Sequence, residues 1–415
     1  MNPLTRQTAV IVFLTFAFAY FLSALIRAIT ATLSPELTQE FQLQARDLGL
    51  LAGGYFLGFA VTQLPLGTWL DRYGPGRVLA CFLAVATLGC LAFAYATSFS
   101  TLLAARILCG VGLSACLMAP LTGYRRWFAP SLQTRANAWM LMTGSSGMVA
   151  STLPVQWLLP TVGWRSMFLG LALFLLLAMA LIVWRVPAWT QAPGPQTGSA
   201  PITAPSYGLV WRDRYFRRMV PLGFFCYGGL LAVQTLWAAP WMEKMAGYTP
   251  LESATGLFWN NIAMLCTFWT WGMAGPWLAR RGLDADRLIS RGLPASFVVL
   301  ALIIIAPDAL MPHAGAMLAL YCMTCSFVTP SQPALAMAFP AELAGRALSS
   351  FNLVIFLGVF CIQWGIGLFI DGLMAVGVAQ TWAYRLAFAA FLACCVGAYV
   401  VFIRGARDNR SRKPP

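Results

Sequence analysis

The chain has 415 residues, 60% of them hydrophobic and 10% charged, with a mean hydropathy of +0.73 and a formal net charge of +14. This composition excludes an ordinary soluble globular protein and indicates a polytopic membrane protein that lies in the lipid bilayer. The positive charge would also suit nucleic acid, but the basic residues are placed as a membrane topology requires, so we expect no nucleic-acid partner.

Hydrophobic runs near the ~20 residues that cross a bilayer recur along the chain and predict twelve transmembrane helices, an all-α membrane protein. We expect these helices near residues 8–32, 48–70, 78–97, 101–123, 136–160, 166–185, 219–241, 254–279, 287–307, 314–337, 348–371 and 383–404. The first run is followed by Ser34, Pro35 and Glu36 instead of a small-residue cleavage site, so we expect it to remain attached as a span.

Residues 186–218, between the sixth and seventh predicted spans, include a stretch rich in Pro, Gly, Gln, Ser and Thr and poor in aliphatic side chains. We interpret them as a flexible cytoplasmic linker. The linker separates an N-terminal bundle of six helices (1–185) from a C-terminal bundle of six helices (219–404). Residues 405–415 then form a basic cytoplasmic tail.

Most of the 27 Lys and Arg residues fall on the same side of the predicted membrane as the N-terminus. Those expected on the opposite side are Arg46, Arg165, Lys244 and Arg385. The positive-inside rule therefore predicts that both termini are cytoplasmic. With a bacterial host assumed, we expect a multi-pass protein of the inner membrane.

The two halves share sequence patterns. Residues 67–74 (Gly-Thr-Trp-Leu-Asp-Arg-Tyr-Gly) are echoed by residues 275–282 (Gly-Pro-Trp-Leu-Ala-Arg-Arg-Gly). In a second echo, three residues of the first half match three residues of the second half at the same separation in the sequence. The pairs are Phe128 with Phe339, Arg135 with Arg346, and Gly147 with Gly358. Two parallel six-helix repeats are typical of transporters in which the halves rock about a site at their interface.

With the linker, the repeat and the loop motif together, the chain resembles the major facilitator superfamily over essentially its whole length. The first cytoplasmic loop motif of that family stands here as Gly67, Asp71, Arg72, Gly74 and Arg77, with Gly76 where the family usually has a basic residue. The resemblance implies two pseudo-symmetric six-helix bundles and a gating role for this motif. The alternative is a solvated loop pair with only a topogenic role. Ala279 replaces the aspartate in the second half, so an equivalent gate there would be weaker.

Arg106, followed by Gly110 and Gly112, is similar to the fourth-helix signature of the family, whose arginine is proposed to assist gating or proton coupling. Arg106 could equally be a structural cation that donates hydrogen bonds to carbonyl groups. We include the matched pair Arg135 and Arg346 with the predicted gating residues.

Arg27 lies about two-thirds along the first predicted span, where burying a charge costs roughly 2.5 to 3.5 kcal/mol. Tyr20, Ser23 and Thr30 share its face if the segment is helical. A permanent cation inside a membrane needs an anionic partner, so we expect this polar face to lie on the path of an anion. The alternative is an arginine that extends to the outer interface or caps carbonyl groups.

The first span is also similar to a narrower branch, the organophosphate and organic-anion transporters, through Ala19, Tyr20, Arg27, Pro35, Asp47, Leu48 and Gly49. In those relatives the arginine binds the phosphate or carboxylate of the substrate, and a second arginine on span seven completes the contact. Span seven here has no arginine and offers Tyr227, Gln234 and Trp241 on one face. One cation instead of two favours a singly charged anion such as a monocarboxylate.

Other central polar side chains are sparse, namely Gln156, Gln234, Asn260, Asn261, Gln332, Asn352 and Gln363. An amide costs free energy in hydrocarbon unless it is paired, so we expect these groups to face the interior. Each could contact a substrate or join two helices. The predicted substrate-binding set is Arg27, Tyr20, Gln156, Gln234, Asn260, Asn261, Asn352 and Gln363.

No predicted span carries an acidic residue at its centre, and Asp371 at the outer end of span eleven is the nearest. A proton relay normally uses such a group, so either the substrate carboxylate carries the proton or the protein is a uniporter or an exchanger. The lone His313 leaves no Ser-His-Asp arrangement, and the pair Cys322 and Cys325 has no partner pair. We therefore expect no enzyme activity, no cofactor and no metal.

These observations predict a monomeric secondary transporter that moves a small organic anion across the inner membrane by alternating access. The first alternative is an exporter of a drug, siderophore or other amphipath, in which tryptophans such as Trp241 and Trp259 would line a wide cavity. Residues 144–154 lack the Gly-Pro of the family's drug-antiporter signature, which disfavours multidrug export. The second alternative is a transporter-like sensor, against which the short tail after Arg404 argues.

Overall fold

The computed structural model describes residues 4–189 and 207–410, and the regular structure of these residues is helical. The expected all-α membrane fold is therefore confirmed. In the described part, nine helices are long and apolar enough to cross a membrane, or ten when the bent pair α2 and α3 is counted as one span. The two further spans that complete the expected twelve correspond to α7 and α13, which lie where the sequence predicts them.

The helices of the N-terminal half are α1 (Arg6–Phe41), α2 (Ala45–Val61), α3 (Gln63–Tyr73), α4 (Pro75–Ala94), α5 (Phe99–Leu113), α6 (Ala115–Trp127), α7 (Pro130–Ala150) and α8 (Leu153–Arg185). Gly163 has a φ of 72° and breaks α8 into two parts. The first part continues the fifth predicted span and the second part is the sixth.

The helices of the C-terminal half are α9 (Tyr207–Arg212), α10 (Arg214–Pro221), η1 (Leu222–Tyr227), α11 (Gly228–Ala232), η2 (Val233–Trp237), α12 (Ala238–Lys244), α13 (Pro250–Arg280), α14 (Ala285–Gly292), α15 (Pro294–Ile305), η3 (Asp308–His313), α16 (Ala314–Cys325), η4 (Ser326–Val328), α17 (Ser331–Ala338), α18 (Ala341–Ala375) and α19 (Gln380–Arg410). Elements α10 to α12 form one continuous span in which η1 and η2 are π-helical turns.

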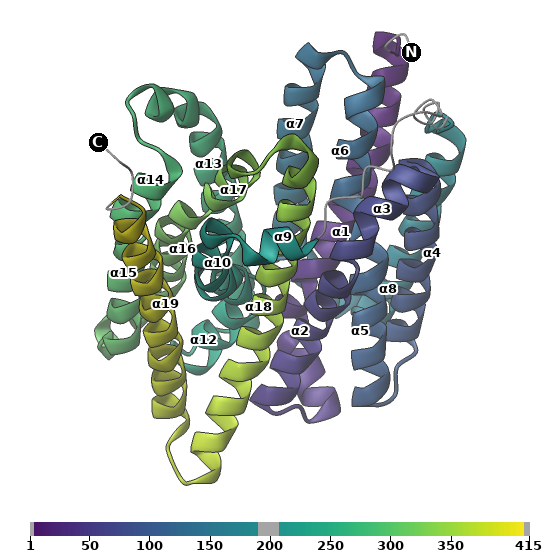
Figure 1. The fold of residues 1–415 in the computed structure, drawn as a ribbon. Helices are drawn as coiled ribbons and strands as arrows, with labels where there is room; N and C mark the ends of the chain where they lie inside the picture. The colour runs from purple at the N-terminus through teal and green to yellow at the C-terminus, as the bar shows by residue number, and fades with distance from the viewer. Residues whose placement is uncertain (1–3, 190–206, 411–415) are drawn as a thin grey trace.

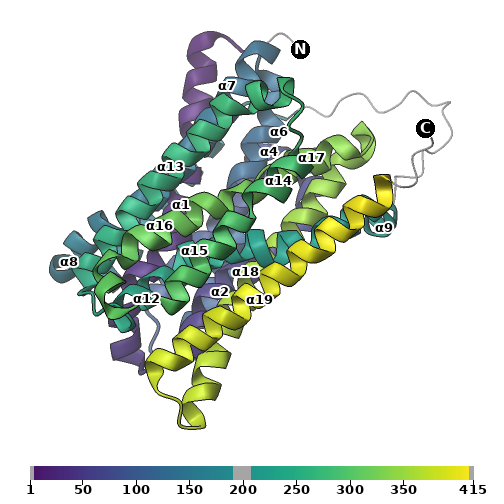
Figure 2. The ribbon, with the colours of Figure 1, turned by 90° about the vertical axis from the view of Figure 1, so that its left-hand side faces the viewer.

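The two halves stand side by side, with α1, α2 and α18 near the centre (Figure 1). The start of α1 and the end of α19 lie toward the same end of the bundle, which we call the inner end; the opposite end is the outer end. Figure 2 shows α13 running alongside α7, which gives a second line of contact between the halves.

The sequence echoes correspond to equivalent packing in the two halves. A methyl group added to Gly147 of α7 would lie 2.4 Å from the carbonyl oxygen of Phe21, and one added to Gly358 of α18 would lie 2.3 Å from that of Phe224. Each glycine therefore lets its helix approach the backbone of the first span of its own half. Close approach through a small residue is a common mode of helix packing in membranes.

The expected linker and tail differ from the structure at their edges. Helix α9 lies within the predicted linker 186–218, and α10 begins at Arg214, before the predicted start of span seven. Residues 190–206, on which the prediction of flexibility mainly rests, lie outside the described residues. Helix α19 continues to Arg410, beyond the predicted boundary at residue 404.

At the outer end, α18 of the C-terminal half is joined to the start of α2 of the N-terminal half. The carboxylate of Asp371 accepts hydrogen bonds from the backbone N–H groups of Ala45 (3.2 Å) and Arg46 (2.8 Å). A carboxylate is favourable there because the first N–H groups of a helix lack partners within the helix. Deeper in the bundle, the rings of Phe59 and Phe356 pack with centroids 4.4 Å apart. The halves are thus in contact from the outer end toward the middle.

Candidate functional site

Arg27 projects from the middle of α1 and is half-buried. Its Nε atom is buried and has no hydrogen-bond partner within the described residues. The ion pairs of this part of the chain join Arg46 to Asp47, Arg165 to Glu40 and Arg218 to Asp286, and none involves Arg27. Ser23 and Thr30, which share the predicted face with Arg27, are buried along the same helix. A half-buried cation without a carboxylate partner is well suited to hold an anion.

Three tyrosines lie within electrostatic range of this cation. The charge of Arg27 acts on the phenol groups of Tyr20 from α1, Tyr55 from α2 and Tyr227 from η1. Tyr20 and Tyr227 also lie within electrostatic range of each other. Because Tyr227 belongs to the C-terminal half, the surroundings of Arg27 are built from both halves. The sequence predicted Arg27 and Tyr20 as neighbours, whereas Tyr55 was not among the predicted residues.

The position of the Tyr20 ring depends on a glycine of α7. A methyl group added to Gly144 would lie 2.5 Å from Cε1 of Tyr20 and 3.0 Å from its hydroxyl oxygen. The ring therefore occupies space that a larger residue would take. Gly144 is thus a positioning residue for Tyr20, and it begins the segment 144–154 that lacks the Gly-Pro of the drug-antiporter signature.

A chain of hydrogen bonds leads from Tyr227 into the C-terminal half. The Tyr227 hydroxyl donates to Oε1 of Gln332 on α17 at 3.2 Å. The Nε2 group of Gln332 donates in turn to Oδ1 of Asn352 on α18 at 2.7 Å. Asn352 is buried. The predicted residue Asn352 is thereby connected to the Arg27 region through Tyr227 and Gln332.

Three predicted amides are engaged in joining helices. Nε2 of Gln234 donates to Oδ1 of Asn261 at 2.9 Å, which links η2 to α13. Nδ2 of Asn261 donates to the carbonyl oxygen of Met148 at 3.4 Å, across the contact between α13 and α7. Nε2 of Gln363 donates to Oγ1 of Thr235 at 3.0 Å. These hydrogen bonds agree with the alternative in which the amides join two helices instead of contacting a substrate.

Two other predicted amides have buried atoms without a partner in the described part of the chain. Both side-chain atoms of Asn260 and Oε1 of Gln156 are in this state. A buried amide without a partner is costly, so each of these positions is suited to a water molecule or a ligand group. No hydrogen bond joins either residue to Arg27 among the described residues, so their place in the binding set stays a prediction.

Arg106 is fully buried and lies behind the Arg27 region. Its Nη1 atom donates to the carbonyl oxygen of Ile26 at 2.9 Å, and its guanidinium carbon lies 5.1 Å from the centre of the Tyr55 ring. This geometry corresponds to the alternative in which Arg106 is a structural cation that bonds a carbonyl group. It also places a positive charge next to the residue that precedes Arg27 and next to Tyr55.

The predicted gating loop at the inner end contains a contact that the sequence did not reveal. Gly74 has a φ of 82° and forms the turn between α3 and α4. The indole Nε1 of Trp189 donates to the carbonyl oxygen of Asp71 at 3.2 Å, and the guanidinium of Arg126 lies 4.5 Å from the Trp189 ring centre. The start of the expected linker therefore packs on this loop.

The other predicted gating residues lie on the surface of the inner end. Asp71, Arg72, Arg77 and Arg135 are exposed. The guanidinium of Arg346 lies 5.6 Å from the ring of Tyr207, at the start of α9, and the Tyr207 hydroxyl donates to the carbonyl oxygen of Leu64 at 3.0 Å. Gly67 has open space around it. Their role in gating stays a prediction.

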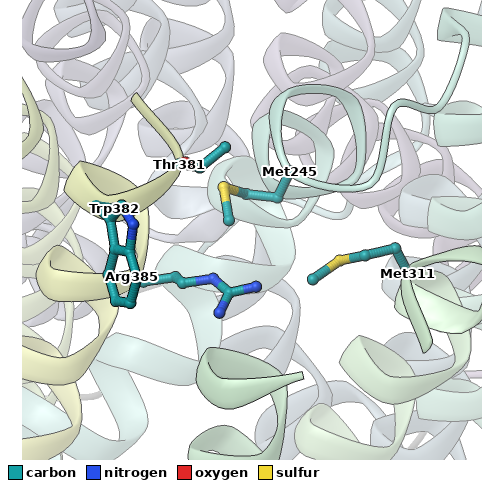
Figure 3. Close-up of a pocket in the computed structure, with 5 residues that line it drawn as sticks. All are labelled: Met245, Met311, Thr381, Trp382 and Arg385. Atoms are coloured by element: carbon teal, nitrogen blue, oxygen red, sulfur yellow. The ribbon is translucent and has the colours of Figure 1, made fainter. Parts of the chain in front are cut away.

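A separate pocket of about 320 Å³ opens at the outer end of the C-terminal half, lined by Met245, Met311, Thr381, Trp382 and Arg385 (Figure 3). The Arg385 guanidinium points between the two methionines (Figure 3) and donates to the carbonyl oxygen of Ala306 at 2.9 Å. No predicted substrate-binding residue lines this pocket. We therefore treat it as distinct from the Arg27 site.

The tryptophans do not assemble into a wide cavity. Trp237 and Trp241 are buried in the C-terminal half, where Nε1 of Trp237 donates to the carbonyl oxygen of Gln363 at 3.1 Å and the Trp241 ring packs on Phe388. Trp259 and Trp269 are 62% and 60% exposed. This distribution gives no support to the predicted alternative of a broad aromatic cavity.

A family model named Major Facilitator Superfamily matches residues 16–362 of the chain, which include α2 to α17 and the Arg27 site. The chain belongs to this superfamily. Members of the superfamily are transporters and not enzymes, so the expectation that this chain is not an enzyme is confirmed through its family.

Several curated relatives within the superfamily are similar to this chain. The 4-hydroxybenzoate transporter PcaK of Pseudomonas putida is 31% identical over 184 residues, which are 44% of this chain and 41% of that protein. The gallate transporter of Pseudomonas putida is 28% identical, and the alignment covers 42% of this chain and 40% of that protein. The cis,cis-muconate transport protein of Acinetobacter baylyi is 26% identical and the alignment covers 60% and 59%. The matched region is thus about two fifths of the length of the first two relatives.

Solved superfamily structures share the fold over nearly the whole chain. A bacterial homologue of the human lysosomal transporter Spinster, in an inward-facing and unoccupied conformation, has a TM-score of 0.77 at 16% identity and covers 99% of this chain and 100% of its own. The D-xylose-proton symporter has a TM-score of 0.72 at 13% identity, and the match covers 95% of this chain and 97% of the symporter. These similarities show the arrangement of helices.

Proposed function

We propose that this superfamily member is a secondary transporter that moves a small organic anion across the membrane by alternating access. The observation that supports the proposal is Arg27, a half-buried cation whose buried Nε atom has no partner among the described residues and which lies within electrostatic range of tyrosines from both halves. An anion bound between the halves would contact both of them. Movement of one half against the other would then expose the same site to each side in turn.

The substrate we propose is a monocarboxylate. Tyr227, Gln332 and Asn352 bond to one another as neutral groups, whereas Arg27 can bind one carboxylate through two parallel hydrogen bonds. The names of two relatives agree with a monocarboxylate, because 4-hydroxybenzoate and gallate each carry one carboxylate, whereas the cis,cis-muconate of a third relative carries two. The tyrosine rings around Arg27 would pack against the body of the substrate.

We assign the remaining predicted residues as follows. Tyr20 and Asn352 join Arg27 in the binding site, with Gln156 and Asn260 as candidate contacts through their unpaired amide atoms. Gln234, Asn261 and Gln363 hold helices together and shape the site indirectly. The inner loop with Gly67, Asp71, Arg72, Gly74 and Arg77, together with Arg106, Arg135 and Arg346, would control the inner gate.

We further propose the organisation and location of the protein. The bundles 1–185 and 219–404 would move as two bodies joined by residues 186–218, with 405–415 as a cytoplasmic tail. The basic residues at the inner end support a bacterial inner-membrane location with both termini in the cytoplasm. We propose a monomer, because a site between the two halves of one chain needs no residue from a second copy.

Thermal unfolding of the detergent-purified protein tests the anion site. A ligand that binds the folded state raises the unfolding temperature by mass action. We expect stabilisation by 4-hydroxybenzoate or another carboxylate that is lost in Arg27→Ala and kept in Arg385→Ala, a matched removal of an arginine outside the site. Stabilisation by hydrophobic cations or amphipaths, equal in wild type and Arg27→Ala, would contradict the proposal and favour an exporter.

A further inference from the structure

The hydrogen bonds that join Tyr227, Gln332 and Asn352 run in one direction in this structure. The Tyr227 hydroxyl donates to Oε1 of Gln332 at 3.2 Å, so the amide oxygen of Gln332 accepts. The amide nitrogen of Gln332 consequently faces Asn352 and donates to its carbonyl oxygen at 2.7 Å. The orientation of Asn352 follows, and its amide nitrogen is turned away from Gln332.

This direction determines which groups remain for a ligand. The Nδ2 group of Asn352 has two N–H donors, and the described residues give it no hydrogen-bond partner. The hydroxyl oxygen of Tyr227 has donated its proton and keeps lone pairs that can accept. These donor and acceptor groups are separated by the single amide of Gln332. Tyr227 is the end of the chain that lies in the field of Arg27.

A hydroxyl group suits this pair better than a second carboxylate does. A hydroxyl can accept from Asn352 and donate to Tyr227, whereas an ionised carboxylate can only accept. A second carboxylate would also have to lose its hydration beside three side chains that are all neutral, which is unfavourable. An unsubstituted ring would offer no hydrogen-bonding group to the Nδ2 group of Asn352, which would then lose its contact with water without a replacement.

We propose that Tyr227, Gln332 and Asn352 form a hydroxyl-recognition site, and that the protein selects monocarboxylates with a hydroxyl group at the end remote from the carboxylate. This inference rests on the proposed function, in which Arg27 binds the carboxylate. Asn352 and Tyr227 contact the hydroxyl group, and Gln332 acts as a positioning residue that fixes the orientation of both. Arg27 thus attracts the anion, whereas Tyr227, Gln332 and Asn352 determine which anion is selected.

Binding of three probes tests this assignment by isothermal titration of the purified protein. The probes are 4-hydroxybenzoate, benzoate and terephthalate, which place a hydroxyl, a hydrogen and a second carboxylate at the same ring position. The wild type should bind 4-hydroxybenzoate about tenfold more tightly than either of the others, as expected for one buried hydrogen-bonded group. In Gln332→Leu and Asn352→Leu this ratio should fall toward one while benzoate still binds, which also shows that the variants fold.

Two variants complete the design. Arg27→Ala should weaken all three probes together, and Gln133→Leu, a matched change at the inner start of α7, should keep the wild-type ratio. A ratio that stays the same in Gln332→Leu and Asn352→Leu would overturn the hydroxyl site and leave the transport proposal standing. A wild-type protein that binds none of the three carboxylates would contradict this inference and the proposed function together.

Discussion

Arg27 determines the properties of the site at the scale of single residues. Its charge and its planar guanidinium make separable contributions, because lysine keeps the charge but cannot form two parallel hydrogen bonds to a carboxylate. We expect Arg27→Ala to weaken binding of a carboxylate about tenfold to a hundredfold, as for the loss of a hydrogen bond to a charged group. Arg27→Lys should fall between Arg27→Ala and wild type.

Equilibrium binding of a labelled carboxylate measures this series, with Arg385→Ala as the control that removes an equally charged side chain at the separate pocket. Equal affinities for Arg27→Lys and Arg27→Ala, both close to that of the wild type, would mean that the anion binds elsewhere.

Gly144 makes a second residue-scale prediction. In Gly144→Val the new side chain would collide with the Tyr20 ring, whose Cε1 lies 2.5 Å from the position of a β-carbon. Overpacking of this kind costs about 1–3 kcal/mol, and we expect it to displace Tyr20 and weaken carboxylate binding about tenfold. The control is Gly170→Val in α8, where no neighbouring atom lies within 4 Å. Wild-type affinity in Gly144→Val would show that the placement of Tyr20 is unimportant.

The sequence predicted part of this site for a clear physical reason. Arg27 and Tyr20 stand out because polar groups on one face of an apolar helix are costly and therefore informative. The amides were equally visible, but their partners were not, since a sequence does not tell whether Gln234 meets Asn261 or a substrate. Gln332 was seen as a central polar group but left out of the binding set, because its link to Tyr227 exists only in three dimensions.

At the scale of elements, the contact of α18 with the start of α2 holds the outer ends of the two halves together. We expect Asp371→Asn to weaken it, because a neutral amide loses the attraction to the helix N-terminus, about 1 kcal/mol. That change corresponds to roughly a fivefold shift in the ratio of the outer-closed to the outer-open state. The bonds of Asp371 to the N–H groups of Ala45 and Arg46 would be the ones affected.

Distances between spin labels at Gln39 and Val376, both exposed near the outer end, report this shift in a background without exposed cysteines. The control is Asp47→Asn, because Asp47 bonds the N–H of Gln44 at the same helix start but within the N-terminal half. The population with a longer distance between the two labels should grow in Asp371→Asn and not in Asp47→Asn. An identical response of the two variants would remove the special role of Asp371.

The elements themselves were largely predictable, with specific exceptions. Apolar length gives the spans, and the echoes at Gly147 and Gly358 anticipated equivalent helix contacts. The π-helical turn η1, which carries Tyr227, was not predicted, because a single inserted residue leaves the apolar pattern almost unchanged. The docking of Trp189 on the turn at Gly74 was not predicted either, because a polar segment gives no sign of a tertiary contact.

For the whole molecule, the distribution of basic residues makes a topological prediction. Green fluorescent protein fused after residue 415 should fluoresce, and alkaline phosphatase fused at the same place should be inactive, because both termini are expected in the cytoplasm. The same two reporters inserted in the outer turn near Gly377 should give the opposite result. Phosphatase activity at the C-terminal fusion would show that the C-terminus is outside the cytoplasm. The end that we call inner would then face away from the cytoplasm.

The central claim is that this superfamily member carries a carboxylate between its halves on Arg27. Counterflow in proteoliposomes tests it most directly: vesicles loaded with unlabelled 4-hydroxybenzoate are diluted into a trace of labelled compound. We predict a transient, saturable accumulation of label with wild-type protein and with Arg385→Ala, and none with Arg27→Ala. Equal accumulation with Arg27→Ala, or exchange of a hydrophobic cation in place of any carboxylate tested, would contradict the account.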